Sequence, residues 1–405
     1  MKFTIVITTY NRLSLLRRSI ASALAQSVPC EVVVADDCSS DGTEAYLCNL
    51  REELRAKGDD RLVYHRNSHN MGHAATINAG VQAATGDWIK PVDDDDYLAD
   101  NCIEEIIKAI ALRPQAVICS CQAAQVDVNQ NELSRTRKAG PGKVFYIPQE
   151  DIHYGMLLEQ IPFGTPIQVA FTRDAFLKSG GWDSRLDVNF DDIDSWVKIA
   201  QFGDAIFINQ CLAYRTVWPG SYNKKFSRQK RLDTHIELKE KIYSLVDEKH
   251  RQNIPSIRAF RNYLRLHWAL VAAKQRSITD VLSLALPAVF YLPAWKLLFI
   301  AIITRYNQQF LLQKQLDKNI WVWTKLSILV GENRFYNYAD FYKIRHYLRL
   351  RHSLIAFKQG KFSIAITLAF PSVFSVAAWK LLIKSIISEH HLQKDALIRK
   401  FVLVY

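Results

Sequence analysis

Strand-like and helix-like segments alternate along the first part of the sequence, and this order restricts the possible folds more than any other feature. Apolar runs of strand length occur at residues 2–10, 30–37 and 61–67. Segments with the apolar spacing of a helix lie between them, at residues 13–27 and 42–58. This order is typical of a mostly parallel sheet covered by helices on both faces. The sequence therefore predicts an α/β fold for the first half of the chain.

Polar segments follow the apolar runs where strands are expected to end. These segments are "TTYNR", "DDCSSDGT" and "DDDD". Ligands of open α/β sheets bind beyond the carboxyl ends of the strands. We therefore expect the three segments to line one crevice, although they are far apart in the sequence.

Charge is distributed unevenly along the chain. Residues 1–257 contain 30 Lys and Arg against 34 Asp and Glu, a net charge of −4. Residues 258–405 contain 22 against 6, a net charge of +16. This division indicates a metal-using unit joined to a part that meets an anionic surface.

The seven cysteines show no metal-ligand spacing, and their number is odd. The first twelve residues, "MKFTIVITTYNR", lack the apolar core and the small-residue cleavage site of a signal peptide. Both observations favour a reducing cytosol. Cys119 and Cys121 lie in an apolar strand-like run, where burial is favoured over a redox pair.

The C-terminal part contains an internal repeat. Residues 261–303 match residues 345–387 at 21 of 43 positions without a gap, and Trp295 matches Trp379. We interpret the repeat as two copies of a helical hairpin. The predicted organisation has three parts: an α/β domain at residues 1–225, a helical linker at 226–257, and a basic, all-helical, membrane-associating region at 258–405.

Residues 281–303 are apolar apart from Lys296, and the segment is long enough to span a bilayer. However, it contains two prolines, and its partner at 365–387 carries Lys380 and Lys384. A lysine at the centre of a spanning helix costs about 2.5–3.5 kcal/mol. Helices lying in the membrane interface, with the tryptophans and lysines at headgroup level, are favoured. A spanning or re-entrant pair and a fully soluble helical module remain as alternatives.

Four consecutive carboxylates, Asp93 to Asp96, follow a short apolar run and precede an apolar helix-like segment. Hard cations such as Mg²⁺ or Mn²⁺ prefer carboxylate oxygens, and such a cation neutralises a polyphosphate leaving group. In an extended segment, Asp93 and Asp95 point to one face and the other two to the opposite face. The alternative is a solvated acidic turn, but the place of the run at a strand end favours a metal site.

Two further acidic segments have the chemistry of a site. Asp37 follows a buried strand, where a carboxylate can accept a hydrogen bond from a base N–H or a ribose hydroxyl. Helix capping explains Asp41 well but Asp37 poorly. Asp191, Asp192 and Asp194 open a predicted helix whose apolar side includes Trp196. Asp192 suits a general base, whereas the alternative is that these acids occupy the first turn only because the helix dipole favours negative charge there.

Six segments in this order resemble the family-2 inverting glycosyltransferases of the GT-A fold. They are "TTYNR", "VVVADDCSSDGT", "NMGHAATINAG", "GDWIKPVDDDDYL", "GGWD" and "FDDIDSW". The resemblance covers roughly residues 1–222. It implies a nucleotide-diphosphate-sugar donor and a single displacement at the anomeric carbon.

The resemblance also implies roles for individual residues. Thr9, Tyr10 and Arg12 would wall the nucleotide pocket, and Asp37 would contact the base. Asp93 would lie toward the ribose and Asp95 on the metal, while Asp94 fits a variant of the same motif. Gly72 and Asn78 would pack beneath the diphosphate, and His73 is expected to cap a helix or face solvent. Asp192 would be the catalytic base, and Asp191 would help to bind the acceptor.

Two departures from the family pattern affect these expectations. The family often has a histidine near the metal where this chain offers Trp218, so metal binding is expected to be looser. The Gln-x-x-Arg-Trp signature of processive synthases is absent, which favours the addition of one sugar per encounter. The expected partners are a donor with uridine favoured, a lipid-linked or envelope glycan acceptor, and an anionic membrane. The expected location is the cytoplasmic face of the membrane, as a peripheral protein.

Other functions fit the sequence less well. A phosphatase with a nucleophilic aspartate needs its Asp-x-Asp after the first strand, and a dinucleotide-dependent oxidoreductase needs a glycine-rich turn there. Neither feature is present. The aromatic residues of the basic half lie within long apolar segments, which argues against nucleic-acid binding. The remaining rival is a catalytically silent scaffold that keeps the fold and binds a membrane surface.

Overall fold

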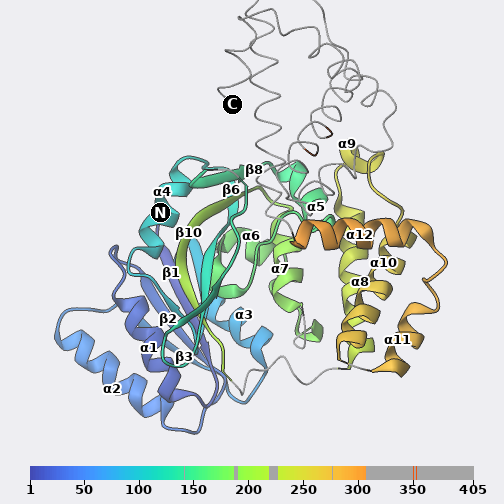
Figure 1. Cartoon of the computed structure of the whole chain (residues 1–405). Coiled ribbons are helices and arrows are strands. Elements are labelled where there is room, and N and C mark those ends of the chain that lie inside the picture. The colour runs from blue at the N-terminus through green and yellow to red at the C-terminus, as the bar shows by residue number, and fades with distance from the viewer. Residues whose placement is uncertain are drawn as a thin grey trace, which may run out of the picture. The chain divides into compact units, whose positions relative to one another are not determined.

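The structure is a computed structural model, and it describes residues 1–140, 142–186, 190–218, 227–275 and 277–306, together with Leu350 and Ser353. The chain divides into two compact units, Met1–Leu298 and Phe299–Tyr405. The first unit is a sheet flanked by helices and followed by a helical segment (Figure 1). The predicted fold class is therefore confirmed.

Ten strands form one sheet, in the order β3-β2-β1-β4-β9-β6-β10-β5, with β7 beside β6 and β8 beside β10. Strands β3, β2, β1 and β4 are parallel, as are β6 and β10, whereas β9 runs antiparallel between β4 and β6. The strands are β1 Phe3–Thr9, β2 Glu31–Asp36, β3 Leu62–Arg66, β4 Trp88–Asp93, β5 Tyr97–Leu98, β6 Ala116–Val126, β7 Glu132–Arg135, β8 Val144–Ile147, β9 Val169–Thr172 and β10 Asp204–Thr216.

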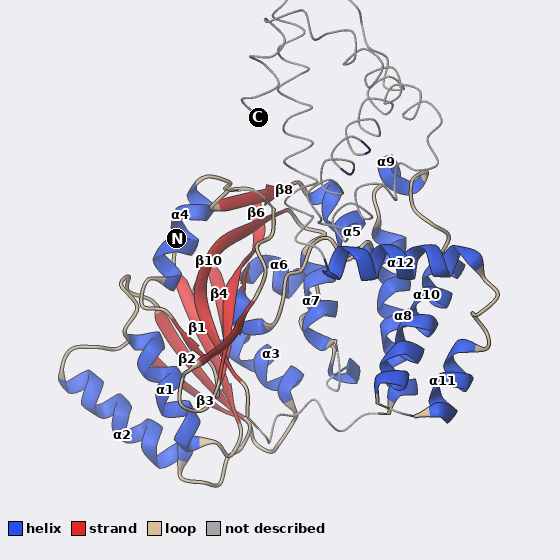
Figure 2. Cartoon of the chain, in the orientation of Figure 1, coloured by secondary structure: helices blue, strands red, loops and turns tan. Residues whose placement is uncertain are grey.

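Helices cover both faces of this sheet (Figure 2). Those near the sheet are α1 Leu13–Leu24, α2 Thr43–Ala56, α3 His73–Ala83, α4 Cys102–Ala111, α5 Gln149–Leu157, α6 Arg173–Lys178 and α7 Asp191–Ile199. Two 3₁₀ turns, η1 Pro166–Gln168 and η2 Ser184–Leu186, accompany them. The later helices are α8 Arg228–Leu245, α9 Glu248–Arg251, α10 Ile257–Lys274, α11 Ile278–Ala285 and α12 Leu292–Tyr306.

The core explains why the first strands are so apolar. All seven residues of β1 are buried because α1 packs on one face of the sheet and α3 on the other. Gly80 allows α3 to come close to the sheet, since a Cβ atom there would lie 2.5 Å from the Val6 side chain. Cys119 and Cys121 are buried and free, as the sequence predicted.

A lysine lies fully buried in β4, three residues before the first of the four aspartates. Lys90 Nζ donates to the carbonyl oxygens of Pro166, Ile167 and Val169, two of which lie at 3.3 and 3.1 Å. Burial lowers the pKa of Lys90. These hydrogen bonds fix η1 and the start of β9 against β4, so the strand that leads into the acidic turn is firmly held.

The helices after the sheet belong to the same compact unit. Lys239 of α8 donates to the carbonyl oxygens of Met156 and Leu157 at the end of α5, at 3.1 and 2.9 Å. Helix α10, the first helix of the first repeat, packs on α8, and α11 packs on α10. The predicted domain boundaries stay a prediction, and the second repeat lies almost entirely outside the described residues.

Among the described residues, no helix is both long enough and apolar enough to cross a bilayer. Residues 281–303, the segment considered for spanning, are divided between α11 and α12 with a turn between them.

Candidate active site

Strand β4 ends at Asp93, and the chain then turns. The amide of Asp96 donates to the carbonyl oxygen of Asp93 at 3.0 Å. The turn brings together Asp93, Asp95 and Asp96, whose carboxylate oxygens lie within 4.8 Å of one another. Three such oxygens suit a hard divalent cation. The pairing of Asp93 with Asp95 follows the sequence expectation, but Asp96 lies with them and not on the opposite face.

Asp94 points to a different set of partners. Its carboxylate accepts from Thr9 Oγ1 at 2.8 Å and from Arg12 Nη1 at 3.0 Å. Burial raises the pKa of Asp94 to about 6, although the charge of Arg12 opposes that shift. Two residues expected at the nucleotide pocket, Thr9 and Arg12, therefore meet at Asp94, and Tyr10 between them is 45% exposed.

The end of β10 fixes the other side of the turn. Thr216 N donates to Asp96 Oδ1 at 2.8 Å, and Trp218 Nε1 donates to Asp95 Oδ2 at 2.9 Å. The guanidinium carbon of Arg12 lies 5.3 Å from the centre of the Trp218 ring. Burial and the charge of Asp93 raise the pKa of Asp95, and the Trp218 hydrogen bond partly offsets this. Trp218, which stands where the family often has a histidine, thus donates to a carboxylate of the candidate metal site.

His73 joins the acidic turn to a second group of acids. Its Nε2 lies 3.1 Å from Asp93 Oδ1, and its Nδ1 lies 3.7 Å from Asp191 Oδ2. Burial opposes protonation of His73, but hydrogen bonds and charges of Asp191 and Asp93 outweigh it and raise the pKa of His73 well above its usual value. Burial would also raise the pKa of Asp93, yet the contact with His73 holds that pKa below its usual value. His73 makes no capping hydrogen bond at the start of α3, and its side chain is 38% exposed, so the expectation that it caps a helix or faces solvent holds only in part.

The second group of acids opens α7, as the sequence predicted. Asp191, Asp192 and Asp194 occupy its first turn, and the apolar side of the helix, including Trp196, is fully buried. Burial, together with the charges of Asp191 and Asp93, raises the pKa of Asp192 to about 7. A carboxylate with this pKa can take up a proton near neutral pH.

Helix α3 is tied to the "GGWD" segment, which leads into α7. Asn78 accepts from the backbone amide of Trp182 at 2.8 Å and donates to its carbonyl oxygen at 2.9 Å. Gly181 has a φ of 68°, and a Cβ atom there would lie 2.6 Å from Asn78 Oδ1. The Trp182 ring meets His73 edge-on at 5.3 Å and Trp196 at 6.0 Å. These contacts set the distance between the two groups of acids.

Asp37 is buried and holds the segment that leads into α3. Its carboxylate accepts from Asn67 Nδ2 at 2.8 Å, from the Met71 amide at 2.8 Å and from the Gly72 amide at 2.9 Å. Sequence reasoning assigned Asp37 to a nucleotide base and did not foresee these bonds. Asp37, just after β2, thus binds the amide of Gly72, and the next residue, His73, contacts Asp93 at the end of β4. The ends of β2 and β4 therefore converge.

Replacing Asp37 by alanine is expected to lower the free energy of unfolding by about 3 kcal/mol, because two part-buried backbone amides and the buried side-chain amide of Asn67 lose a charged acceptor. Urea unfolding of the protein without any ligand measures this change. Asp60→Ala is the control, since the Asp60 side chain is 80% exposed and pairs only with Arg55 at the surface. Equal stability of the two variants would contradict the structural role of Asp37.

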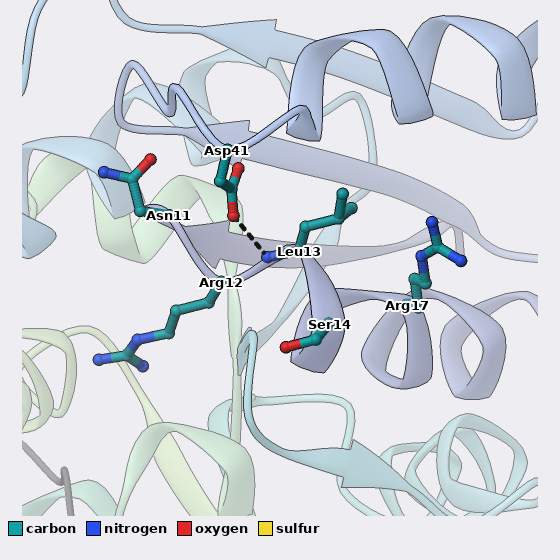
Figure 3. A pocket seen from close by; sticks show the side chains of 6 residues that line it. All are labelled: Asn11, Arg12, Leu13, Ser14, Arg17 and Asp41. Atoms are coloured by element: carbon teal, nitrogen blue, oxygen red, sulfur yellow. Dashed lines mark hydrogen bonds between the residues drawn. The ribbon is translucent and has the colours of Figure 1, made fainter.

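A hollow of about 530 Å³ lies at the start of α1 (Figure 3), and Arg12, which lines it, also donates to Asp94 of the acidic turn. It is lined by Asn11, Arg12, Leu13, Ser14, Arg17 and Asp41. Asp41 accepts from the Leu13 amide at 2.8 Å, and the Arg12 side chain extends away from Ser14 and Arg17. Of the residues expected at the nucleotide pocket, only Arg12 lines this hollow, so we place the site at the acidic turn.

The chain was compared with known families and proteins. Residues 4–180 match the family model described as Glycosyl transferase family 2. The succinoglycan biosynthesis protein ExoO of Rhizobium meliloti is 35% identical over 126 residues, which are 31% of this chain and 34% of that protein. The GalNAc(5)-diNAcBac-PP-undecaprenol beta-1,3-glucosyltransferase of Campylobacter jejuni is 32% identical over 109 residues, which are 26% of this chain and 34% of that protein. The chain thus spans about a third of the length of these two relatives.

Among solved structures, S. aureus TarS residues 1–349, in complex with UDP-GlcNAc, aligns with a TM-score of 0.50. The alignment covers 70% of this chain and 90% of that chain at 16% identity. At this identity the likeness concerns the fold, and it agrees with the fold class predicted from the sequence.

Proposed function

We propose that this chain, whose residues 4–180 match the glycosyl transferase family 2 model, is an inverting glycosyltransferase that moves one sugar from a nucleotide-diphosphate sugar to a hydroxyl acceptor. The observation that supports this most strongly is the convergence of two acid groups joined by His73. The acidic turn suits a cation, and Asp192 suits a proton acceptor. Such a transfer requires both functions: a cation for the departing diphosphate and a base for the acceptor hydroxyl.

We assign the donor to the acidic turn. Asp95 and Asp93 would hold Mn²⁺ or Mg²⁺, with Asp96 as a third carboxylate in reach. When bound, the cation supplies positive charge that stabilises the departing nucleoside diphosphate. The nucleotide would lie against Thr9, Tyr10, Arg12, Asp37 and Asp94. Uridine is favoured, and the TarS structure with UDP-GlcNAc supports a donor of that class.

The acceptor would lie at the start of α7. Its hydroxyl oxygen forms a bond to the anomeric carbon as the bond from that carbon to the diphosphate oxygen breaks, and Asp192 takes the hydroxyl proton. Asp191 would help to bind the acceptor, and His73 holds Asp191 near Asp93. Attack from the face opposite the leaving group inverts the anomeric configuration.

The value of kcat/KM is expected to rise about tenfold per pH unit below pH 7 and to level off above it. The sign follows from the raised pKa of Asp192, about 7, because the carboxylic acid below that pH cannot accept a proton. The charged groups around Asp192 are Asp191, Asp93 and His73. Initial rates at saturating Mn²⁺ measure the profile, and donor affinity is measured in parallel at each pH. A flat profile with constant donor affinity would remove Asp192 from this role.

The acceptor is proposed to be a lipid-linked or envelope glycan. The name of the C. jejuni relative includes an undecaprenol-linked glycan, which supports this class. The absence of the processive signature supports one sugar per encounter. We place the enzyme at an anionic membrane surface on its cytoplasmic side, with no role for nucleic acid.

The direct test is turnover of a panel of nucleotide sugars with Mn²⁺ or Mg²⁺, followed by NMR of the product. Transfer with an inverted anomeric centre is the expected result. A protein that binds nucleotide but is as inert as its Asp192→Asn variant toward every donor and acceptor would instead be a silent scaffold.

A further inference from the structure

An unusual apolar surface lies on the segment from Ile278 to Trp295. Six large apolar side chains in this segment are exposed: Ile278, Leu282, Leu286, Phe290, Leu292 and Trp295. Phe290 is 95% exposed, Leu292 78% and Ile278 74%. We call these six side chains the outer apolar surface. Exposed patches of this kind mark sites of interaction.

The segment is apolar on both sides, which is unusual for a helix at a protein surface. Leu284, Ala288 and Ala294 of this segment are buried. Helix α11 packs on α10 and lies outside α8 and α10, away from the sheet (Figure 1). A surface helix of a soluble protein normally has a polar outer face, whereas here large apolar side chains are exposed beside Thr279 and Ser283.

The internal repeat gives an independent reason to assign a function to this surface. The six exposed positions correspond, 84 residues later, to Phe362, Ile366, Phe370, Phe374, Val376 and Trp379. All six are apolar, while the exposed polar residues Thr279, Ser283 and Lys296 correspond to Ser363, Thr367 and Lys380. Positions that only face solvent would be free to become polar in one copy or the other. Apolar residues at all six positions of both copies therefore indicate a function for this surface.

The charges around the surface favour anionic lipid over a protein partner. Residues 257–298 contain one acid, Asp280, which pairs with Arg228 and accepts from Ser277 Oγ at 2.9 Å. Arg258 lies against the Tyr291 ring at 5.1 Å, and Lys274 and Lys296 are exposed on either side of the segment. The Trp295 N–H already donates to Val289 O at 2.7 Å, so its half-exposed ring can enter an apolar layer without an unpaired donor.

We propose that the outer apolar surface inserts into the interfacial region of an anionic bilayer, with Arg258, Lys274 and Lys296 at the headgroups. In the sequence, residues 362–379 repeat this apolar pattern, and two weak anchors linked in one chain would bind more firmly than either alone. This inference extends the proposed function, because an enzyme held at a membrane meets acceptors carried by lipid.

The test uses the full chain and vesicles of phosphatidylcholine with or without phosphatidylglycerol. The first triple variant is Ile278→Glu, Leu282→Glu and Phe290→Glu, and the second is Phe362→Glu, Ile366→Glu and Phe374→Glu. Each triple is expected to weaken binding to the anionic vesicles at least about tenfold, and the two together are expected to abolish it. The control pair is Leu112→Glu with Leu133→Glu, two exposed apolar residues of the sheet domain, which should bind as the wild type does.

Two results would overturn the proposal. One is unchanged vesicle binding when the first triple is added to the second. The other is a wild-type dimer, measured by light scattering, that the first triple converts to a monomer while no form binds vesicles. Thermal unfolding and donor hydrolysis are measured on every variant to detect damage to the fold or to the active site. Both should stay unchanged in the first triple, because its substituted side chains are exposed. Loss of vesicle binding in a protein that never turns over a donor would support this surface and contradict the transferase.

Discussion

Asp192→Asn is expected to lower kcat for sugar transfer by about 10³-fold while donor affinity stays within about twofold of the wild-type value. Asparagine has the same shape but cannot accept the hydroxyl proton. The pKa of Asp192, raised to about 7 by burial and by Asp191 and Asp93, suits this proton transfer in the wild type. Single-turnover rates with saturating donor and Mn²⁺ measure the loss.

Two further variants make that measurement specific. Asp191→Asn should mainly raise KM for the acceptor, because Asp191 is assigned to acceptor binding. Asp174→Asn is the matched surface control, since the Asp174 side chain is 73% exposed in the first turn of α6. If Asp192→Asn keeps its kcat, or if the product retains the anomeric configuration of the donor, Asp192 is not the base.

Asp95→Asn is expected to weaken Mn²⁺ binding by about 100-fold or more and to reduce transfer to a similar extent. The reason is the geometry of the acidic turn, where three carboxylate oxygens lie within 4.8 Å and the loss of one leaves two. Calorimetric titration of the protein with Mn²⁺ alone measures the affinity without relying on activity. Mn²⁺ binding equal to that of the wild type would exclude Asp95 as a ligand.

Variants at two neighbouring residues distinguish the metal ligands from the residues that support them. Asp94→Asn should leave Mn²⁺ affinity nearly unchanged, because the Asp94 carboxylate faces Thr9 and Arg12. Trp218→Phe should weaken Mn²⁺ binding by about tenfold, since it removes the N–H that orients Asp95 and keeps a smaller aromatic ring. If Asp94→Asn weakens Mn²⁺ binding more than Asp95→Asn does, the metal ligand is Asp94, as in the variant form of the motif.

The first strands and helices were predictable because their physics is local. A parallel strand covered on both faces is a nearly continuous apolar run, and β1 is buried at all seven positions. Strand β9 was not foreseen, since four residues are too few to show a period. Its antiparallel course between β4 and β6 depends on pairings that no local pattern records.

The site was predictable only in part, for a related reason. The acids at Asp93, Asp95 and Asp192 were visible because several carboxylates at a strand or helix end need an explanation. The contribution of Asp96 depends on a turn, Asp96 N to Asp93 O, that interrupts the expected alternation. The contacts of His73 were not foreseen because a single histidine carries no pattern, and its partners are the distant residues Asp93 and Asp191.

The position of β10 has a consequence for the order in which the protein is made. This strand, Asp204–Thr216, lies inside the sheet between β6 and β5, and its end supplies the contacts of Thr216 and Trp218 with the acidic turn. A nascent chain that has not yet released residue 204 from the ribosome therefore has β6 as an open edge, which is a template for pairing with other chains. In such a chain Asp95 and Asp96 also lack the hydrogen bonds from Trp218 and Thr216 that orient them. The acidic turn reaches its final geometry only when β10, the last strand among the described residues, has joined the sheet, so a chaperone has most to protect just before that moment.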